Sequence, residues 1–283
     1  MDYVTPIEIV SDAVRAAEKK AGLSALDLVI RGALSGVFLG YATTLAMTAT
    51  SQGLPGIVGA LIFPVGFVIL VLLGLELVTG NFALLPMGWL EGRLSMGKLL
   101  RNWTWVYAGN LIGSLLYAYL FYAAITSFGS SNGGALGDLV RQTAVKKTVG
   151  YAALGAAGWG TAFVKAILCN WMVTLGAILA FASRSTAGKV LAMWLPITIF
   201  FAHGYEHCVV NMFVIPAGMM LKAPVSAGQW WIWNQIPVTL GNILAGVVFT
   251  GVALWWTHTQ RRQQAAAEAE AGIAVVTAKA MAR

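Results

Sequence analysis

The chain has 283 residues, of which 58% are hydrophobic and only 10% are charged, and its formal net charge is +7. Because soluble domains carry about 25% charged residues, this composition excludes an ordinary soluble protein. Several stretches nearly free of charge are long enough to span a bilayer, which takes about 20 apolar residues. The sequence predicts an all-α integral membrane protein with one helical bundle, and we expect no cofactor and no nucleic-acid partner.

The first predicted element is a short helix at residues 6–20. Charged residues alternate there with Ile9, Val10 and Val14, a pattern typical of a helix that lies in the membrane interface. We expect a cytoplasmic segment that contains this helix, then a transmembrane domain, then a cytoplasmic tail, at residues 1–27, 28–258 and 259–283.

Six membrane spans are expected, at residues 28–50, 57–90, 102–126, 159–183, 188–221 and 230–257. The segments on the same side of the membrane as the N-terminus hold 13 Lys and Arg residues. The loops on the opposite side of the membrane hold only Arg141, Lys146, Lys147 and Lys222. Because positive charges favour the cytoplasmic side of a membrane, both termini are predicted to be cytoplasmic. We expect the membrane to be the inner (plasma) membrane of a bacterium.

The second and fifth spans are too long for a simple crossing, and the same pattern interrupts both. Gly74 to Asn81 and Gly204 to Asn211 share Gly, Glu and Asn at the same spacing. With three spans in each half, the halves insert in opposite orientations. The pattern therefore predicts two inverted three-helix repeats whose broken helices 2 and 5 meet near the membrane midplane. Irregular backbone at that depth is tolerated where it faces protein or a water-lined cavity.

Three further features lie between and within the later spans. Ser127 to Lys147 contains Gly, Ser, Asn and cations, and is expected to be an external loop in which Lys146 and Lys147 are either solvated or attract anions. Lys165, in the fourth span, either extends to the membrane surface or attracts anions at a pore mouth. Cys169 and Cys208 lie in apolar segments, and we interpret them as buried small hydrophobic residues.

The two repeated glutamates, Glu76 and Glu206, require an explanation, since a charge at the bilayer centre costs at least ~2.5–3.5 kcal/mol. They are either pore carboxylates for a cation or caps that accept hydrogen bonds from backbone N–H groups freed by the helix breaks. We favour capping, because both occur at equivalent and structurally demanding positions. The same interpretation applies to the repeated asparagines Asn81, Asn211, Asn110 and Asn242.

His207 breaks the symmetry of the repeat, because Leu77 stands at the corresponding place. A single imidazole near the middle of a pore can donate a hydrogen bond or a proton to an anion. The alternative is a neutral histidine bonded to a backbone carbonyl. His203 to His207 also spells H-x-x-E-H, a zinc-peptidase pattern. That reading needs a further ligand, and the only downstream carboxylates, Glu268 and Glu270, lie in the tail. We therefore expect that the protein binds no metal and is not an enzyme.

Three segments together resemble the formate/nitrite transporter family: residues 168–173, Gly204 to His207, and Asn211 to Gly218. Gly74 to Asn81 matches the broken second helix of that family. The resemblance covers about residues 5–258. It implies a homopentamer of aquaporin-like protomers, each with a pore for small monovalent anions such as formate or nitrite.

The resemblance also assigns candidate residues to the substrate pathway. The family's loop threonine falls on Thr79, its central histidine on His207 and its fourth-helix asparagine on Asn170. Its bulky constriction residues fall on Phe63, Phe67, Leu77, Val78 and Phe200. The family's outer lysine falls only loosely on Lys146 or Lys147, because the stretch that follows is several residues longer here. His203 stands where a small or apolar residue is expected.

The predicted mechanism brings an anion past Phe63 and Phe200 to His207, with Thr79 as a hydrogen-bond partner. Protonating the anion would remove the cost of passing an apolar constriction. From reference pKa values that transfer is uphill by roughly 4 kcal/mol, a gap that desolvation narrows. Passive flow past a hydrogen-bonding histidine is the alternative mechanism. A neutral-solute channel of the aquaporin type is the alternative function, although its paired Asn-Pro-Ala loops are absent.

Overall fold

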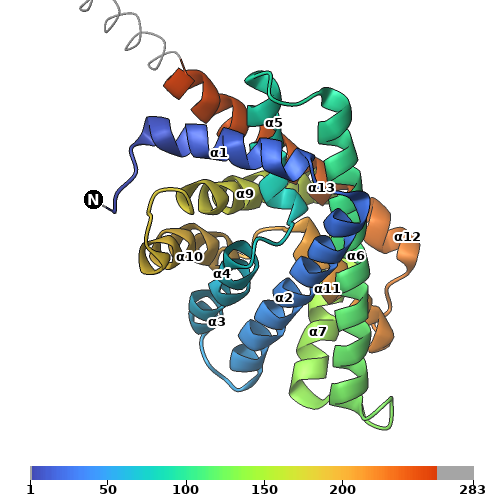
Figure 1. Cartoon of the computed structure of the whole chain (residues 1–283). Helices are drawn as coiled ribbons and strands as arrows, with labels where there is room; N and C mark the ends of the chain where they lie inside the picture. The colour runs from blue at the N-terminus through green and yellow to red at the C-terminus, as the bar shows by residue number, and fades with distance from the viewer. Residues whose placement is uncertain (1, 260–283) are drawn as a thin grey trace, which may run out of the picture.

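A computed structural model describes residues 2–259, so residues 260–283 of the predicted tail, which include Glu268 and Glu270, lie outside the described residues. Figure 1 shows the helices in chain order. The first half contains α1 (Pro6–Ala21), α2 (Ala25–Ser51), α3 (Gly56–Ile62), α4 (Pro64–Leu72), α5 (Val78–Leu90) and α6 (Met96–Thr126). The second half contains α7 (Gly134–Lys147), α8 (Val149–Ala152), α9 (Gly155–Leu179), α10 (Thr186–Ala202), α11 (Cys208–Met220), α12 (Ala227–Trp230), η1 (Trp231–Gln235), α13 (Ile236–Leu244) and η2 (Ala245–Val252).

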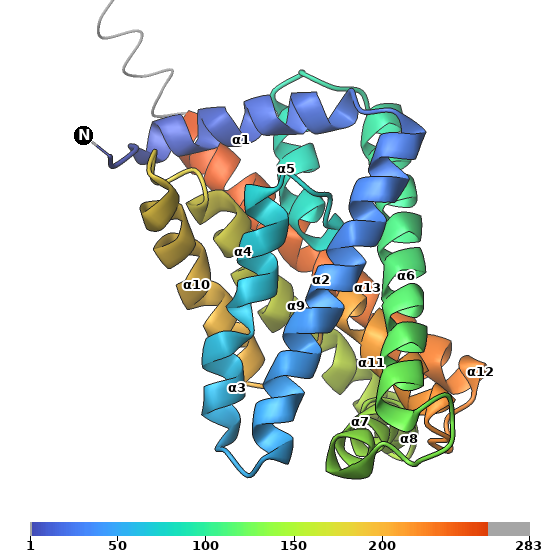
Figure 2. The ribbon, with the colours of Figure 1, turned by 60° about the horizontal axis from the view of Figure 1, so that its bottom comes forward.

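The long helices run beside one another, and α1, α7 and α8 lie at the two ends of the bundle (Figure 2). Four helices in the described part are long and apolar enough to cross a membrane: Ala25–Ser51, Met96–Thr126, Gly155–Leu179 and Ala227–Thr259. Shorter apolar helices cover Gly56–Leu72, Thr186–Ala202 and Cys208–Met220. Helix α1 lies across one end of the bundle, and α7 and α8 lie at the opposite end (Figure 2).

The expected external loop between residues 127 and 147 is only partly a loop. Residues 134–147 form the helix α7, which packs against α11. Its buried positions, Gly137, Val140 and Ala144, recur at intervals of three and four residues. That spacing places them on one helical face, which the high polar content of the segment obscured in the sequence.

Glycines allow α2 and α6 to pack closely. A Cβ atom built at Gly32 would lie 3.0 Å from the backbone oxygen of Val106, and one at Gly109 would lie 3.1 Å from the Cα of Gly32. Small residues at such crossings let helices approach closely in lipid. The close approach holds the polar residues of α6 against the loop that precedes α5.

The N-terminal residues are fastened to the turn between α9 and α10. The Asp2 carboxylate accepts hydrogen bonds from the Ser183 hydroxyl at 2.8 Å and from the Ser185 backbone N–H at 2.7 Å. The Val4 N–H donates to the carbonyl of Ala182 at 3.0 Å. The hydroxyl of Ser183, followed by the Ser185 N–H, lowers the pKa of Asp2. A group with a lowered folded pKa contributes fully above its unfolded pKa, so this attachment stays intact at neutral and mildly acidic pH.

Candidate functional site

Two extended segments interrupt the helices at the predicted repeats. Helix α4 ends at Leu72 and α5 begins at Val78, while α10 ends at Ala202 and α11 begins at Cys208. Gly74 and Gly204 have φ angles of 64° and 62°, a left-handed conformation that favours glycine because it has no Cβ. Leu77 and His207 then adopt matching extended angles, with φ of −117° and −114°. The two segments therefore share one backbone geometry.

Asparagines from neighbouring helices bind the backbone of these segments. Asn110 Oδ1 accepts the N–H of Val78 at 3.0 Å, and Asn110 Nδ2 donates to the carbonyls of Gly32 and Glu76 at 2.8 and 2.9 Å. Asn242 repeats this arrangement. It accepts the Cys208 N–H at 2.9 Å and donates to the carbonyls of Ala166 and Glu206 at 2.8 and 3.1 Å. Asn110 and Asn242 thus bind backbone groups that the helix breaks leave without a partner, which is the role expected for them.

The carboxylate of Glu76 has different partners from those expected. It accepts hydrogen bonds from Lys20 Nζ and from Asn81 Nδ2, both at 2.8 Å. Asn81 Nδ2 also donates to Asn102 Oδ1 at 2.9 Å, and Asn102 Nδ2 donates to the backbone oxygen of Lys20 at 3.2 Å. Glu76 thus binds a half-buried cation from α1 instead of capping free backbone N–H groups.

The second half repeats the network around Glu206. Its carboxylate accepts from Lys147 Nζ at 2.7 Å, from Asn211 Nδ2 at 2.7 Å and from the Tyr151 hydroxyl at 2.8 Å. Asn211 Nδ2 donates to Asn234 Oδ1 at 2.8 Å, and Asn234 Nδ2 donates to the backbone oxygen of Lys147 at 3.0 Å. Lys147 is therefore paired with a carboxylate, which differs from both sequence interpretations of it as a solvated or an anion-attracting lysine.

Sequence reasoning missed four members of these networks: Lys20, Asn102, Asn234 and Tyr151. A signal for two of them was present, because Asn102 precedes Asn110 by the same eight residues that separate Asn234 from Asn242. The glutamates are 1% and 2% exposed. Removing one partner of a buried ion pair leaves an uncompensated charge, which costs about 3–5 kcal/mol. The networks therefore fix the two helices that lie across the ends of the bundle.

His207 and Thr79 meet where the two interrupted segments approach each other. His207 Nε2 lies 3.1 Å from Thr79 Oγ1, and both residues are buried. Asn170 lies beside the pair, since its Nδ2 donates to the backbone oxygens of Thr79 at 3.2 Å and Asn242 at 2.7 Å. The structure thus brings together three of the predicted pathway residues, from α5, from α9 and from the extended segment before α11.

The hydrogen bonds of His207 define which ring nitrogen carries its proton. Nδ1 accepts the backbone N–H of Val210 at 3.2 Å and so caps the start of α11. A nitrogen that accepts from an N–H cannot itself carry a hydrogen directed there. In this arrangement the imidazole is neutral, with its proton on Nε2 and directed at the Thr79 oxygen. The threonine hydroxyl is then free to donate its own proton in a further hydrogen bond.

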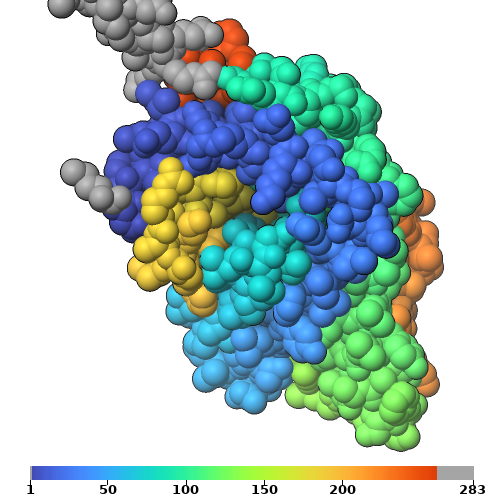
Figure 3. Space-filling view, viewed as in Figure 1, coloured from blue at the N-terminus to red at the C-terminus, as the bar shows by residue number. Residues whose placement is uncertain are grey.

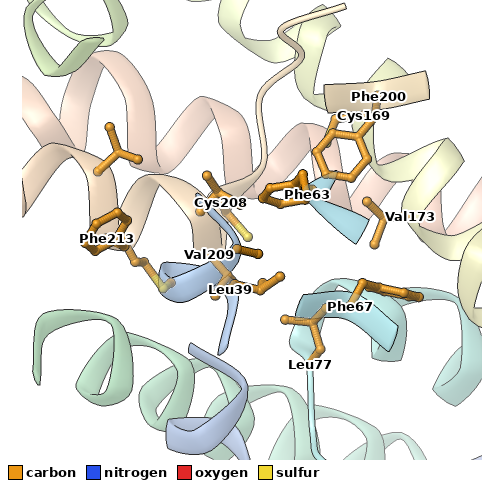
Figure 4. Packing of buried hydrophobic residues seen from close by; sticks show 14 of the residues in the cluster. Leu39, Phe63, Phe67, Leu77, Cys169, Val173, Phe200, Cys208, Val209 and Phe213 are labelled. Atoms are coloured by element: carbon orange, nitrogen blue, oxygen red, sulfur yellow. The ribbon is translucent and has the colours of Figure 1, made fainter. Parts of the chain in front are cut away.

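The predicted constriction residues lie in one hydrophobic cluster. Figure 4 shows Phe63, Phe67, Leu77 and Phe200 in this cluster. The ring centroids of Phe63 and Phe200 are 5.6 Å apart in an edge-on arrangement, and the Phe200 ring lies 5.7 Å from that of His207. Val78, also predicted, is fully buried in the same cluster. The imidazole is therefore enclosed by apolar side chains.

Two cavities lie on opposite sides of this cluster. The first, the α1-side cavity, has a volume of about 260 Å³ and is lined by residues that include Lys20, Phe67, Leu77, Asn81 and Lys189. It opens where α1, α4 and α10 meet (Figure 3). The second, the α7-side cavity, has a volume of about 210 Å³ and is lined by residues that include Thr43, Lys147, Phe200, Tyr205 and His207. The α1-side cavity has two lysines and the α7-side cavity has one, and both cavities reach residues of the apolar cluster.

The other candidate residues have positions outside the central pair. Lys165 is half-buried on α9 and its Nζ lies 5.9 Å from the centre of the Tyr151 ring. His203 is exposed, stacks on Tyr205 at 5.1 Å and is hydrogen-bonded through Nδ1 to the carbonyl of Ile199. Within residues 2–259 no group of three or more His, Cys, Asp or Glu side chains could hold a metal ion. The H-x-x-E-H segment instead has its Glu206 and His207 engaged by the partners described above.

The sequence matches the formate/nitrite transporter family over residues 7–256. The chain belongs to this family. It is 36% identical over 261 residues to a probable formate transporter of Methanothermobacter thermautotrophicus, a match that covers 87% of this chain and 93% of that protein. It is 31% identical over 278 residues to the formate channel FocA of Escherichia coli strain K12, a match that covers 90% of this chain and 94% of that protein.

Solved structures of the same kind have this fold. An FNT family ion channel matches with a TM-score of 0.77 at 29% identity, covering 88% of this chain and 98% of that one. A pentameric formate channel with formate bound matches with a TM-score of 0.69 at 28% identity, covering 83% of this chain and 98% of that one. The chain is therefore an all-helical integral membrane protein of a transporter family, not of an enzyme family.

Proposed function

We propose that this protein carries formate, nitrite or a similar small monovalent anion across the membrane. Its family and the functions of its named relatives support anion transport. The observation that carries the proposal is the contact of 3.1 Å between His207 Nε2 and Thr79 Oγ1, enclosed by apolar rings between two lysine-containing cavities. A neutral solute would need no cation without a paired carboxylate, so Lys189 in the α1-side cavity favours anions over the aquaporin-like alternative.

We further propose six membrane spans in two inverted repeats, with both termini cytoplasmic in a bacterial inner membrane. In this arrangement residues 56–90 and 186–221 each form one interrupted span. The matching glycine angles, asparagine caps and glutamate networks of the two halves support it. By analogy with the pentameric relative, five chains assemble in the lipid bilayer, each with its own pore.

The path through a protomer joins the two cavities. An anion enters the α7-side cavity, passes Phe63 and Phe200, binds at Thr79 and His207, and leaves past Phe67 and Leu77 into the α1-side cavity. Val78 and Asn170 hold the narrow segment in place. A bare anion pays a large desolvation cost in such a constriction unless it is hydrogen-bonded or neutralised. The hydroxyl of Thr79, oriented by the imidazole proton, supplies the hydrogen bond.

Proton-linked passage sets a condition on His207. A neutral imidazole that gives up its only proton becomes an anion, so His207 must first gain a proton on Nδ1. That nitrogen currently accepts the N–H of Val210, and a proton can reach it only if this bond opens. The proposal therefore couples anion protonation to a local movement at the start of α11.

Uptake into proteoliposomes tests the proposal. Formate and nitrite would be offered separately at pH 5 and pH 7.5, with protein-free liposomes as the control. We expect saturable flux of at least one anion, faster at pH 5 because protonation removes the desolvation cost of the charge. The absence of flux of both anions, combined with permeation of water or glycerol, would contradict the proposal and favour a neutral-solute channel.

A further inference from the structure

The α1-side cavity contains a cation that the proposed path does not use. We infer that Lys189, near the start of α10, forms a separate binding subsite for the transported anion in this cavity. The inference rests on the proposed anion transport and adds to it a second binding position, at the α1-side end of the path. Such a subsite would lower the half-saturating concentration only for anions that enter from the side of α1.

The two lysines of this cavity differ in their partners. Lys20 Nζ is bound to the Glu76 carboxylate at 2.8 Å, so its charge is compensated. Lys189 is half-buried and lines the same cavity, and no ion pair joins it to a carboxylate within residues 2–259. The nearby Asp2 carboxylate is held by Ser183 and Ser185 instead. Lys189 is thus the cavity's uncompensated positive charge.

The surroundings of Lys189 suit a small carboxylate or oxyanion. The walls of the cavity include the apolar side chains of Phe67, Leu70 and Phe181. Low-dielectric walls focus the field of a charge and raise the local concentration of its counter-ion. A volume of about 260 Å³ holds a small anion together with water, so the ion binds without complete desolvation.

The opposite cavity lacks an equivalent group. The residues that line the α7-side cavity include one lysine, Lys147, and its charge is compensated by Glu206 at 2.7 Å. The span from Gly56 to Leu72, which occupies the place of α10 in the first half, contains no charged residue. The polar scaffold is therefore repeated in both halves while Lys189 is not, and the pore has one electropositive end.

Initial uptake of formate into membrane vesicles of both orientations tests this subsite. The unmodified chain would be compared with Lys189→Gln, Lys189→Arg and the control Lys98→Gln, which removes an exposed charge on the same side outside the cavity. We expect Lys189→Gln to raise the half-saturating concentration roughly fivefold in one vesicle orientation only, the factor expected for loss of a unit charge near the ion at a hydrated site. Lys189→Arg and Lys98→Gln should stay within about twofold.

The outcomes separate the subsite from the transport proposal. Saturable uptake by the unmodified chain with no change in Lys189→Gln, or with an equal change in both orientations, would overturn the subsite and leave the transport function standing. Uptake of neither formate nor nitrite by the unmodified chain would overturn both. Normal uptake by Lys189→Gln from the unaffected side shows that the variant is folded.

Discussion

At the scale of single residues, one exchange distinguishes the two interrupted segments. Leu77 and His207 have the same backbone angles, but only His207 caps the helix that follows and contacts Thr79. The imidazole therefore has two separate roles, one at each ring nitrogen. A substitution that keeps the cap while removing the Nε2 proton can separate them.

His207→Asn is that substitution, since asparagine is among the strongest N-cap residues. The hydrogen bond to Thr79 would be lost, and we expect the uptake rate to fall roughly tenfold, the effect of about one buried hydrogen bond. The advantage of pH 5 over pH 7.5 should also disappear. Thr79→Val, which removes the other partner at nearly constant shape, should give a similar loss. Unchanged flux of His207→Asn at both pH values would exclude proton transfer through this residue.

At the scale of helices, asparagine caps hold the interrupted segments. Asn110 on α6 and Asn242 on α13 each bind one N–H and two carbonyls, and both are fully buried. Their bonds replace those that the helix breaks remove. The start of α5 and the start of α11 therefore depend on side chains from other helices.

Asn110→Ala should lower the thermal stability of the protein markedly. It leaves the Val78 N–H and the Glu76 carbonyl without this partner, and each unsatisfied buried group costs about 1–3 kcal/mol. Asn242→Ala is expected to have a similar effect, because its bonds are equivalent. The exposed Gln142 on α7 provides the control, and Gln142→Ala should change stability by no more than about 0.5 kcal/mol. Thermal unfolding in detergent, followed by size-exclusion chromatography, would measure the differences; equal melting temperatures for all three variants would refute the capping role.

The interrupted segments could be predicted from the sequence, whereas the partners of the two glutamates and the helix α7 could not. The shared spacing of Gly, Glu and Asn located both interrupted segments, because left-handed glycines and buried polar groups leave a visible pattern in apolar helices. The partners of Glu76 and Glu206 could not be predicted in this way. Lys20 and Lys147 lie on α1 and α7, and their distance in sequence from the glutamates is bridged only by tertiary packing. The same packing made α7 a helix where a polar loop was expected.

At the scale of the whole molecule, the outer surface is strongly apolar. Leu191 and Leu195 on α10 are 69% and 68% exposed, and Leu116 and Leu120 on α6 are 51% and 53% exposed. Soluble monomers seldom expose apolar patches of this kind over a large area. Lipid and neighbouring subunits are the expected covering, in agreement with the proposed pentamer.

Native mass spectrometry of the protein released from detergent would measure the assembly. We expect a complex of five chains, each of 30.0 kDa, because the relative with bound formate is pentameric and shares the fold. The bundle of one protomer contains its own two cavities, so the pore count should equal the chain count. A dominant mass of one or four chains would contradict the pentamer.

The single contact between His207 and Thr79 also has a kinetic consequence. The polar scaffold occurs twice, but the contact between an imidazole and a threonine hydroxyl beside the apolar cluster occurs once. In pores with several adjacent sites, bound ions repel one another and this repulsion speeds conduction. Within its described residues, this protein has no second central site next to His207 and Thr79 that could hold such an ion. For anions that enter from the α7 side, where the lysine of the cavity is compensated, the flux should follow a simple hyperbola with concentration, and two different permeant anions should compete for passage.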